Sequence, residues 1–201
     1  MKRSYHHGDL RKALIDGALE VLAEKGVDAF SLRETARRVG VSPAAYKHHF
    51  ADTRALLTEL AALAFTRLAN QLEQASAAAG RERRGCLKAQ AAAYLDFALA
   101  EPALFDLMWR TPLLDVSDPT LVAEKTRAFE CLDRVVRGPS APRISPDDPA
   151  MAPTITCWSV VHGFARLVLD GTLGHDGDAR TRAASRLLPV MLDLVTIPDD
   201  A

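Results

Sequence analysis

Two short helical segments joined by a glycine-containing turn are the feature that most restricts how this sequence can fold. The first segment starts at Ser31-Leu32-Arg33-Glu34, which has the spacing of a capping box. It stops at Gly40, since glycine readily takes the left-handed conformation that ends helices. Ser42-Pro43 then opens a second segment, because serine caps helices and proline fits the first helical position. The pattern predicts a helix-turn-helix ending at Phe50.

Helical periodicity continues on both sides of this motif. A first helix capped by Asp9 is expected to run to Lys25, and the second segment of the motif to cover 43–49. The proline-rich stretch 138–150 is expected to be a loop. Without any convincing strand pattern, the sequence predicts an all-α fold of about nine helices. The remaining helices are expected at 53–79, 81–100, 101 to just before 111, 118–137, 153–173 and 178–195.

Composition and charge exclude several classes of protein. Hydrophobic residues make up 48% of the 201 residues, which is enough for a sizeable core. No apolar run is long enough to span a membrane or resembles a signal peptide, so a cytoplasmic protein without membrane association is expected. The three cysteines are far apart, so neither a disulfide framework nor a metal site is expected, and no cofactor is implied. Residues 1–54 hold ten Lys/Arg and seven Asp/Glu, whereas the remainder is net acidic. A basic N-terminal region followed by an acidic remainder is typical of a nucleic-acid-binding protein with a separate second domain.

A helix-turn-helix places the start of its second helix in the major groove of DNA. Small residues there allow close approach, and Ala44 and Ala45 suit contact with thymine methyl groups. Lys47 can reach bases or phosphates. We therefore expect a DNA-binding domain over 1–54, reaching about residue 69 if the start of the next helix is included, and a second domain over 55–201. The candidate DNA-contacting residues are Arg33, Ser42, Pro43, Ala44, Ala45, Tyr46, Lys47, His48, His49, Thr53 and Arg54.

The segments YHHGDLRKALIDGALEVLAEKG and GVDAFSLRETARRVGVSPAAYKHHFADTRALL resemble the N-terminal region of the tetracycline-repressor (TetR) family. This resemblance covers about residues 5–57. It implies an all-helical homodimer with a ligand-responsive C-terminal domain, usually a repressor acting on a palindromic double-stranded DNA operator. The sequence departs from the family at two positions. Lys47 stands where the family usually has a phosphate-binding tyrosine, and Thr53 stands where a lysine is frequent.

The C-terminal half contains a W-x-x-x-H-G pattern formed by Trp158, His162 and Gly163. It resembles the Trp-His-Gly (WHG) class of C-terminal domains in the TetR family. Large side chains in this half could line an effector pocket or be ordinary core, and His162 could contact the ligand or be a core residue. The candidate pocket residues are Phe97, Phe105, Met108, Trp109, Phe129, Trp158 and His162. Two terminal apolar helices suit a four-helix dimer interface through Val160, Phe164, Leu167, Leu187, Met191 and Leu194.

These patterns favour one function over two others. A DNA-binding transcriptional regulator, repressing until a small molecule releases it, fits the motif best. The alternative is a helical ligand-binding or scaffold protein that has lost DNA reading, which the departures at Lys47 and Thr53 would support. An enzyme is disfavoured, because no phosphate-binding glycine loop, HExxH or GxSxG motif is present.

Overall fold

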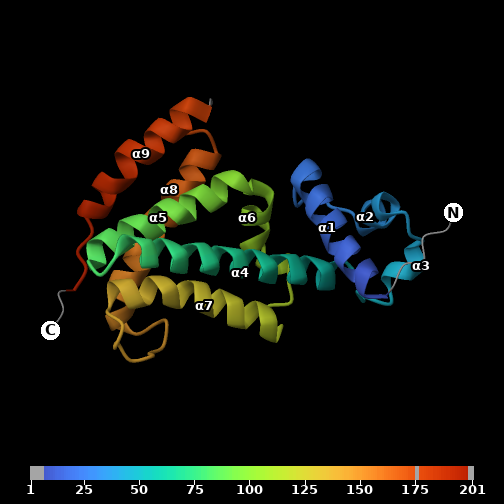
Figure 1. Ribbon diagram of the computed structural model, residues 1–201, viewed down its shortest axis with the longest axis horizontal. Helices are drawn as coiled ribbons and strands as arrows, with labels where there is room; N and C mark the ends of the chain where they lie inside the picture. Colours follow the sequence, from blue (N-terminus) through green and yellow to red (C-terminus); the bar gives the residue numbers. More distant parts are fainter. Residues whose placement is uncertain (1–6, 175–176, 199–201) are drawn as a thin grey trace. The chain divides into compact units, whose positions relative to one another are not determined.

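The computed structural model describes residues 7–174 and 177–198. Within these residues there are nine α-helices, two short 3₁₀ turns and no strand, which confirms the all-α prediction (Figure 1). The helices are α1 (His7–Lys25), α2 (Leu32–Val39), α3 (Pro43–Tyr46), α4 (Thr53–Ala79), α5 (Arg83–Ala100), α6 (Pro102–Met108), α7 (Pro119–Val136), α8 (Ala152–Leu169) and α9 (Gly177–Asp193), with the turns at Thr111–Leu113 and Pro149–Met151.

The chain forms two compact units. The first contains the described residues up to Phe65 together with Glu101–Glu124, and the second contains Thr66–Ala100 and the described residues from Lys125 onward. Helices α4 and α7 therefore contribute residues to both units. The helix-turn-helix lies in the first unit, and the C-terminal pair α8 and α9 lies in the second.

Close packing of α1 on α2 forms the core of the first unit. Leu14, Ala18 and Val21 of α1 have no exposed surface. The two helices approach closely at Gly17, where an added Cβ atom would lie 2.7 Å from Cγ2 of Val39. Since ordinary carbon contacts are about 3.5–4.0 Å, only glycine fits at this position without movement of the helices.

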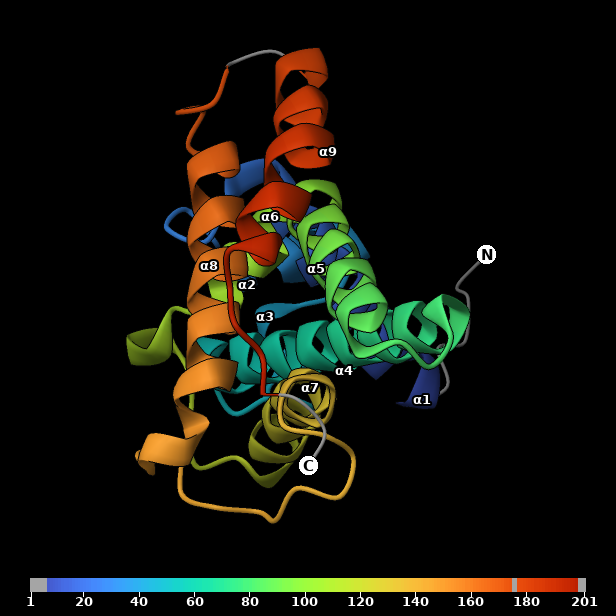
Figure 2. The same cartoon turned by 90° about the vertical axis from the view of Figure 1, so that its left-hand side faces the viewer.

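In the second unit, α5, α8 and α9 pack against one another (Figure 2). Two neighbouring arginines at the start of α5 hold the ends of other helices. Arg83 donates to the carbonyls of Val135 and Val136 at the end of α7. Arg84 donates to the carbonyl of Leu192, at 2.7 Å, close to the end of α9. These contacts satisfy carbonyl groups that a helix end leaves without partners.

Several predicted helix ends were wrong, each for a local reason. Helix α1 already begins at His7, so Asp9 lies inside it rather than at its cap. Helix α5 begins at Arg83 because the Glu82 carboxylate accepts hydrogen bonds from the backbone amides of Arg84 and Gly85, as an N-cap side chain does. Helix α8 ends at Leu169 because Gly171 adopts a left-handed conformation, with φ of 76°.

Candidate DNA-binding site

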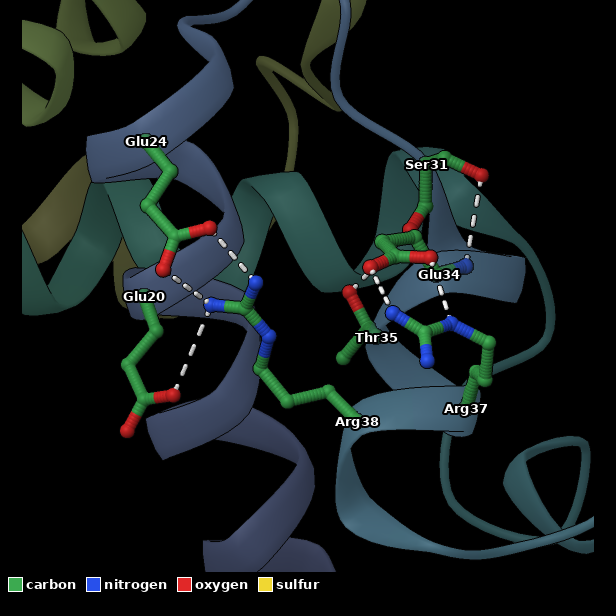
Figure 3. A network of polar contacts seen from close by, with 7 residues as sticks. All are labelled: Glu20, Glu24, Ser31, Glu34, Thr35, Arg37 and Arg38. Atoms are coloured by element: carbon green, nitrogen blue, oxygen red, sulfur yellow. Dashed lines mark hydrogen bonds and ion pairs between the residues drawn. The ribbon is translucent and has the colours of Figure 1, made fainter.

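Helix α2 begins and ends as the sequence predicts. The amide of Glu34 donates to the Ser31 hydroxyl at 3.4 Å, and the Thr35 hydroxyl donates to the Ser31 carbonyl at 3.2 Å. Gly40 closes the helix in a left-handed conformation, with φ of 75°. The Glu34 carboxylate, however, accepts from the Arg37 guanidinium at 2.9 and 2.6 Å (Figure 3). The serine half of the predicted capping box is thus confirmed, whereas the glutamate serves an ion pair.

An arginine of α2 braces this helix against α1. The Arg38 guanidinium donates to both oxygens of the Glu24 carboxylate at 2.7 and 2.6 Å and lies 3.6 Å from the Glu20 carboxylate (Figure 3). This hydrogen bonding holds the pKa of Glu24 below its ordinary value. Together with the tight contact at Gly17, the brace fixes the direction of α2 relative to α1.

Helix α3 is shorter than predicted. It ends at Tyr46 rather than at His49, because the amides of His49 and Phe50 both donate to the Tyr46 carbonyl, at 2.8 and 2.9 Å. This tightened turn leads into Phe50, which is only 4% exposed. The Arg11 guanidinium of α1 lies 5.3 Å from the centre of the Phe50 ring and forms an ion pair with Glu59 of α4 at 2.9 Å. The end of the reading segment is therefore anchored to two longer helices.

The structure separates the predicted DNA contacts by their exposure. Ala45, Tyr46 and His49 are half-buried, and the side chains of Pro43 and Ala44 lie outside the described residues. The exposed positions, which can meet a partner from solution, are Arg33, Ser42, Lys47, His48, Thr53 and Arg54.

Two of these exposed residues behave differently from the sequence-based interpretation. Ser42 occupies the N-cap position of α3, but its side chain makes no capping hydrogen bond in the part of the chain that the structure describes. The Arg54 guanidinium donates to the Leu114 carbonyl at 2.5 Å. One turn further along α4, the Thr58 hydroxyl accepts the Asp115 amide at 2.9 Å. Arg54 thus already has a partner within its own unit.

Sequence reasoning missed the residues that position this surface. Gly17 carried the one available signal, since a glycine inside a helical pattern often marks a close packing contact. The sequence carries no comparable signal for Arg11 and Arg38, because a charged residue on an amphipathic helix does not reveal its partner in another helix.

In the second unit, the Trp-His-Gly pattern is organised around a tyrosine that sequence reasoning also missed. The Tyr94 hydroxyl lies 2.8 Å from Nδ1 of His162. Trp158 lies beside His162, with ring centres 6.2 Å apart, and meets the Phe129 ring edge-on at 5.9 Å. Burial, and then the charge of Arg166, lower the pKa of His162, so the imidazole is neutral at pH 7. Burial raises the pKa of Tyr94.

The seven predicted pocket residues are not gathered in one unit. Phe97, Phe129, Trp158 and His162 belong to the second unit. Phe105, Met108 and Trp109 belong to the first, where Trp109 packs edge-on against Phe65 at 5.7 Å and against Phe105 at 6.2 Å. Phe97, Phe105 and Met108 are at most 3% exposed, so in this structure they are core residues.

The predicted dimer residues differ in their exposure to solvent. Phe164 is 2% exposed and faces the core of its own chain, so little of its surface is left for a partner, and the dimer set as a whole stays a prediction. Leu167, Leu187 and Leu194 are exposed, whereas Val160 and Met191 are half-buried. An open groove of about 590 Å³ lies between α8 and α9. Its lining residues are Ala152, Pro153, Thr156, Val160, Met191, Leu194, Val195 and Thr196.

The described residues offer neither a metal site nor a membrane-spanning helix. No group of three or more His, Cys, Asp or Glu side chains there is arranged to hold a metal ion. No described helix is long and apolar enough to cross a membrane. Cys86, Cys131 and Cys157 are all buried as free thiols.

Comparisons with known proteins identify both parts of the chain. Residues 14–60 match the family described as bacterial regulatory proteins of the tetR family, and residues 87–191 match the tetracyclin repressor-like C-terminal domain. An HTH-type transcriptional repressor of Mycobacterium tuberculosis is 30% identical over 202 residues, covering 94% of this chain and 92% of the relative. An uncharacterised HTH-type transcriptional regulator of Bacillus subtilis is 28% identical over 99 residues, about half of each protein (49% and 51%).

A solved structure has the same fold as this chain. A protein of unknown function from Rhodococcus sp. RHA1 superposes with a TM-score of 0.74 at 34% identity, covering 96% of this chain and 99% of that one. The all-helical fold, the braced helix-turn-helix and the matches to both family descriptions lead to one conclusion. The chain belongs to the TetR family of bacterial DNA-binding transcriptional regulators.

Proposed function

We propose that this protein is a repressor that binds a palindromic DNA operator as a homodimer and is released by a small-molecule effector. The observation that carries the proposal is that Arg33, Lys47 and His48 are exposed on a helix-turn-helix whose helices are braced by Arg11 and Arg38. Repression itself is supported by the name of the M. tuberculosis relative, which is a transcriptional repressor.

The support of α3 matters because so short a helix has no stability of its own. Its end is held by the Phe50 anchor and by Arg11, and its partner α2 is held by Arg38. A reading surface needs such pre-organisation, since base and phosphate contacts lose their value when the groups are mobile. Lys47 is exposed at this end, so its ammonium group can neutralise a DNA phosphate although it replaces the family's usual tyrosine.

Selection of bound genomic fragments, followed by titration of the enriched site, tests the proposal. We expect a palindromic site, with affinity falling steeply as salt rises. Lys47→Ala should weaken binding to all sequences and reduce the slope of log K against log salt by about one. Lys125→Ala, which removes an exposed lysine of α7 instead, is the matched control and should leave the slope unchanged.

Two outcomes would contradict this reasoning. An unchanged salt slope for Lys47→Ala would remove the phosphate role of Lys47. Failure of the folded protein to enrich any palindromic site would instead favour the alternative, a helical ligand-binding or scaffold protein without DNA reading. The comparisons do not favour that alternative, since this chain's relatives are named as regulators.

For the effector, we propose a site beside the aromatic group formed by Tyr94, Phe129, Trp158 and His162. Aromatic faces with a few convergent polar groups are typical of small-molecule sites. Thermal-shift screening of amphipathic aromatic compounds tests this, with each stabilising compound then added to the DNA complex. A true effector should both stabilise the protein and release the DNA, and Trp158→Ala should abolish both effects.

A further inference from the structure

One buried polar atom of the second unit has no hydrogen-bond partner within the part of the chain that the structure describes. It is the side-chain carbonyl oxygen (Oε1) of Gln90 in α5. Gln90 is only 3% exposed, so bulk water does not reach this oxygen. A buried acceptor without a partner loses its hydration and gains nothing in return, whereas an apolar side chain of similar length avoids that loss. The unpaired oxygen therefore indicates a partner outside the described chain.

The side-chain amide of Gln90 is held in one orientation. Its nitrogen (Nε2) donates to the Ser76 hydroxyl of α4 at 2.7 Å and to the Cys131 carbonyl of α7 at 3.0 Å. Turning the amide over would place Oε1 against the Cys131 carbonyl, which can only accept a hydrogen bond. The oxygen therefore stays an acceptor in a fixed position, as a pre-organised recognition group does.

Gln90 is a neighbour of the aromatic group at the proposed effector site. Tyr94 follows Gln90 by four residues on α5, so the two side chains lie on the same face of the helix, and both are buried. From this face the Tyr94 hydroxyl reaches Nδ1 of His162 in α8 at 2.8 Å, and the Trp158 ring lies beside that imidazole. An aromatic ligand that packs on these rings therefore lies within one helical turn of Gln90.

The surroundings of the acceptor favour an uncharged ligand. The Ser76 and Tyr94 hydroxyls are neutral, and burial raises the pKa of Tyr94 further. Burial, and then the charge of Arg166, lower the pKa of His162, so the same positive charge disfavours a cationic ligand beside the imidazole. An anion next to Oε1 is disfavoured too, because a carbonyl oxygen repels negative charge and a buried charge needs a partner.

We propose that Oε1 of Gln90 accepts a hydrogen bond from the effector, which is an uncharged aromatic compound with an N–H or O–H donor. This inference rests on the proposed effector site and adds the chemistry that the site selects. A ligand of the same shape without the donor leaves the buried acceptor unpaired, so it binds more weakly. Gln90 is thus a specificity-determining residue of this site.

Two matched pairs of probes test the inference: phenol with toluene, and indole with benzothiophene. The compounds of each pair have similar shapes, and only the first has a donor. NMR titration of the full chain should give a dissociation constant about ten-fold lower for each donor compound than for its counterpart. Gln90→Met keeps the length of the side chain but removes the acceptor, so this preference should disappear. Gln74→Met, the same change at an exposed position of α4, is the control and should retain the preference.

A second measurement needs no substitution. In the wild-type protein, the donor compounds should shift the NMR signals of the Gln90 side-chain amide, because a hydrogen bond to Oε1 polarises the whole amide group. Their counterparts should leave these signals nearly unchanged. A water molecule that satisfies Oε1 permanently would make the signals insensitive to all four probes, which overturns the inference.

The remaining outcomes separate this inference from the proposed function. Equal binding within both pairs, a preference that survives Gln90→Met, or the failure of all four probes to bind overturns the inference. Compounds that release the operator DNA without any preference for a donor overturn the inference and leave the proposed function intact. Probes that bind with the expected preference but release no DNA support the role of Gln90 in binding and overturn the proposed effector function of the site.

Discussion

Replacement of Gly17 by alanine is expected to destabilise the unit that carries the helix-turn-helix. The added Cβ atom would lie 2.7 Å from Cγ2 of Val39, whereas carbon atoms in contact are about 3.5–4.0 Å apart. Valine has one strongly preferred χ1 rotamer in a helix, so its methyl group cannot easily turn away. Helices α1 and α2 must therefore separate by several tenths of an ångström.

The size of the effect is the difference between two opposing contributions. Overpacking a close contact costs about 1–3 kcal/mol. Alanine in place of glycine inside a helix gains about 1 kcal/mol. The expected net loss is about 1 kcal/mol, which lowers the unfolding midpoint of a unit of this size by about 5 °C. Because the direction of α2 depends on this contact, operator affinity should fall as well.

The contribution of Val39 makes the reasoning testable by a double-mutant cycle. In a Val39→Ala background the opposing methyl group is absent, so Gly17→Ala should stabilise the protein by about 1 kcal/mol. Urea unfolding of the four proteins gives the free energies, and fluorescence anisotropy with labelled operator gives the affinities. If Gly17→Ala has the same effect in both backgrounds, the close contact does not explain the glycine.

Ser31→Ala removes the N-cap of α2 and should cost about 1 kcal/mol in urea unfolding, with Ser31→Gly costing only a few tenths. An unchanged free energy of unfolding in Ser31→Ala would show that the hydroxyl does not cap the helix. The pKa of His162 is lowered from 6.5 in the folded protein, so the unfolded chain takes up a proton at higher pH than the folded one. The stabilising effect of this neutral imidazole should be fully present above about pH 6.5 and be lost as the pH falls below it. His162→Gln should abolish this part of the pH dependence; a stability that rises on acidification through this range would contradict it.

Much of the secondary structure could be predicted from the sequence, because helices are closed by local signals. The Ser31 cap, the Gly40 stop and the long helix α4 over Thr53–Ala79 were all predicted. The same local motif carried the resemblance to the TetR family that the comparisons confirm. The wrong ends had different local causes: the Glu82 carboxylate caps α5, a tightened turn at Tyr46 ends α3, and Gly171 ends α8.

Only the tertiary structure decided which helices those side chains meet. Periodicity shows that α8 has an apolar stripe, but the stripe is wide enough that Phe164 faces the core while Leu167 faces solvent. Periodicity also cannot show that His162 contacts Tyr94, since the two residues lie on different helices. Capping and periodicity act over a few residues and are written in the local sequence. Contacts between helices depend on how whole faces fit together, so they arise only when the chain has packed.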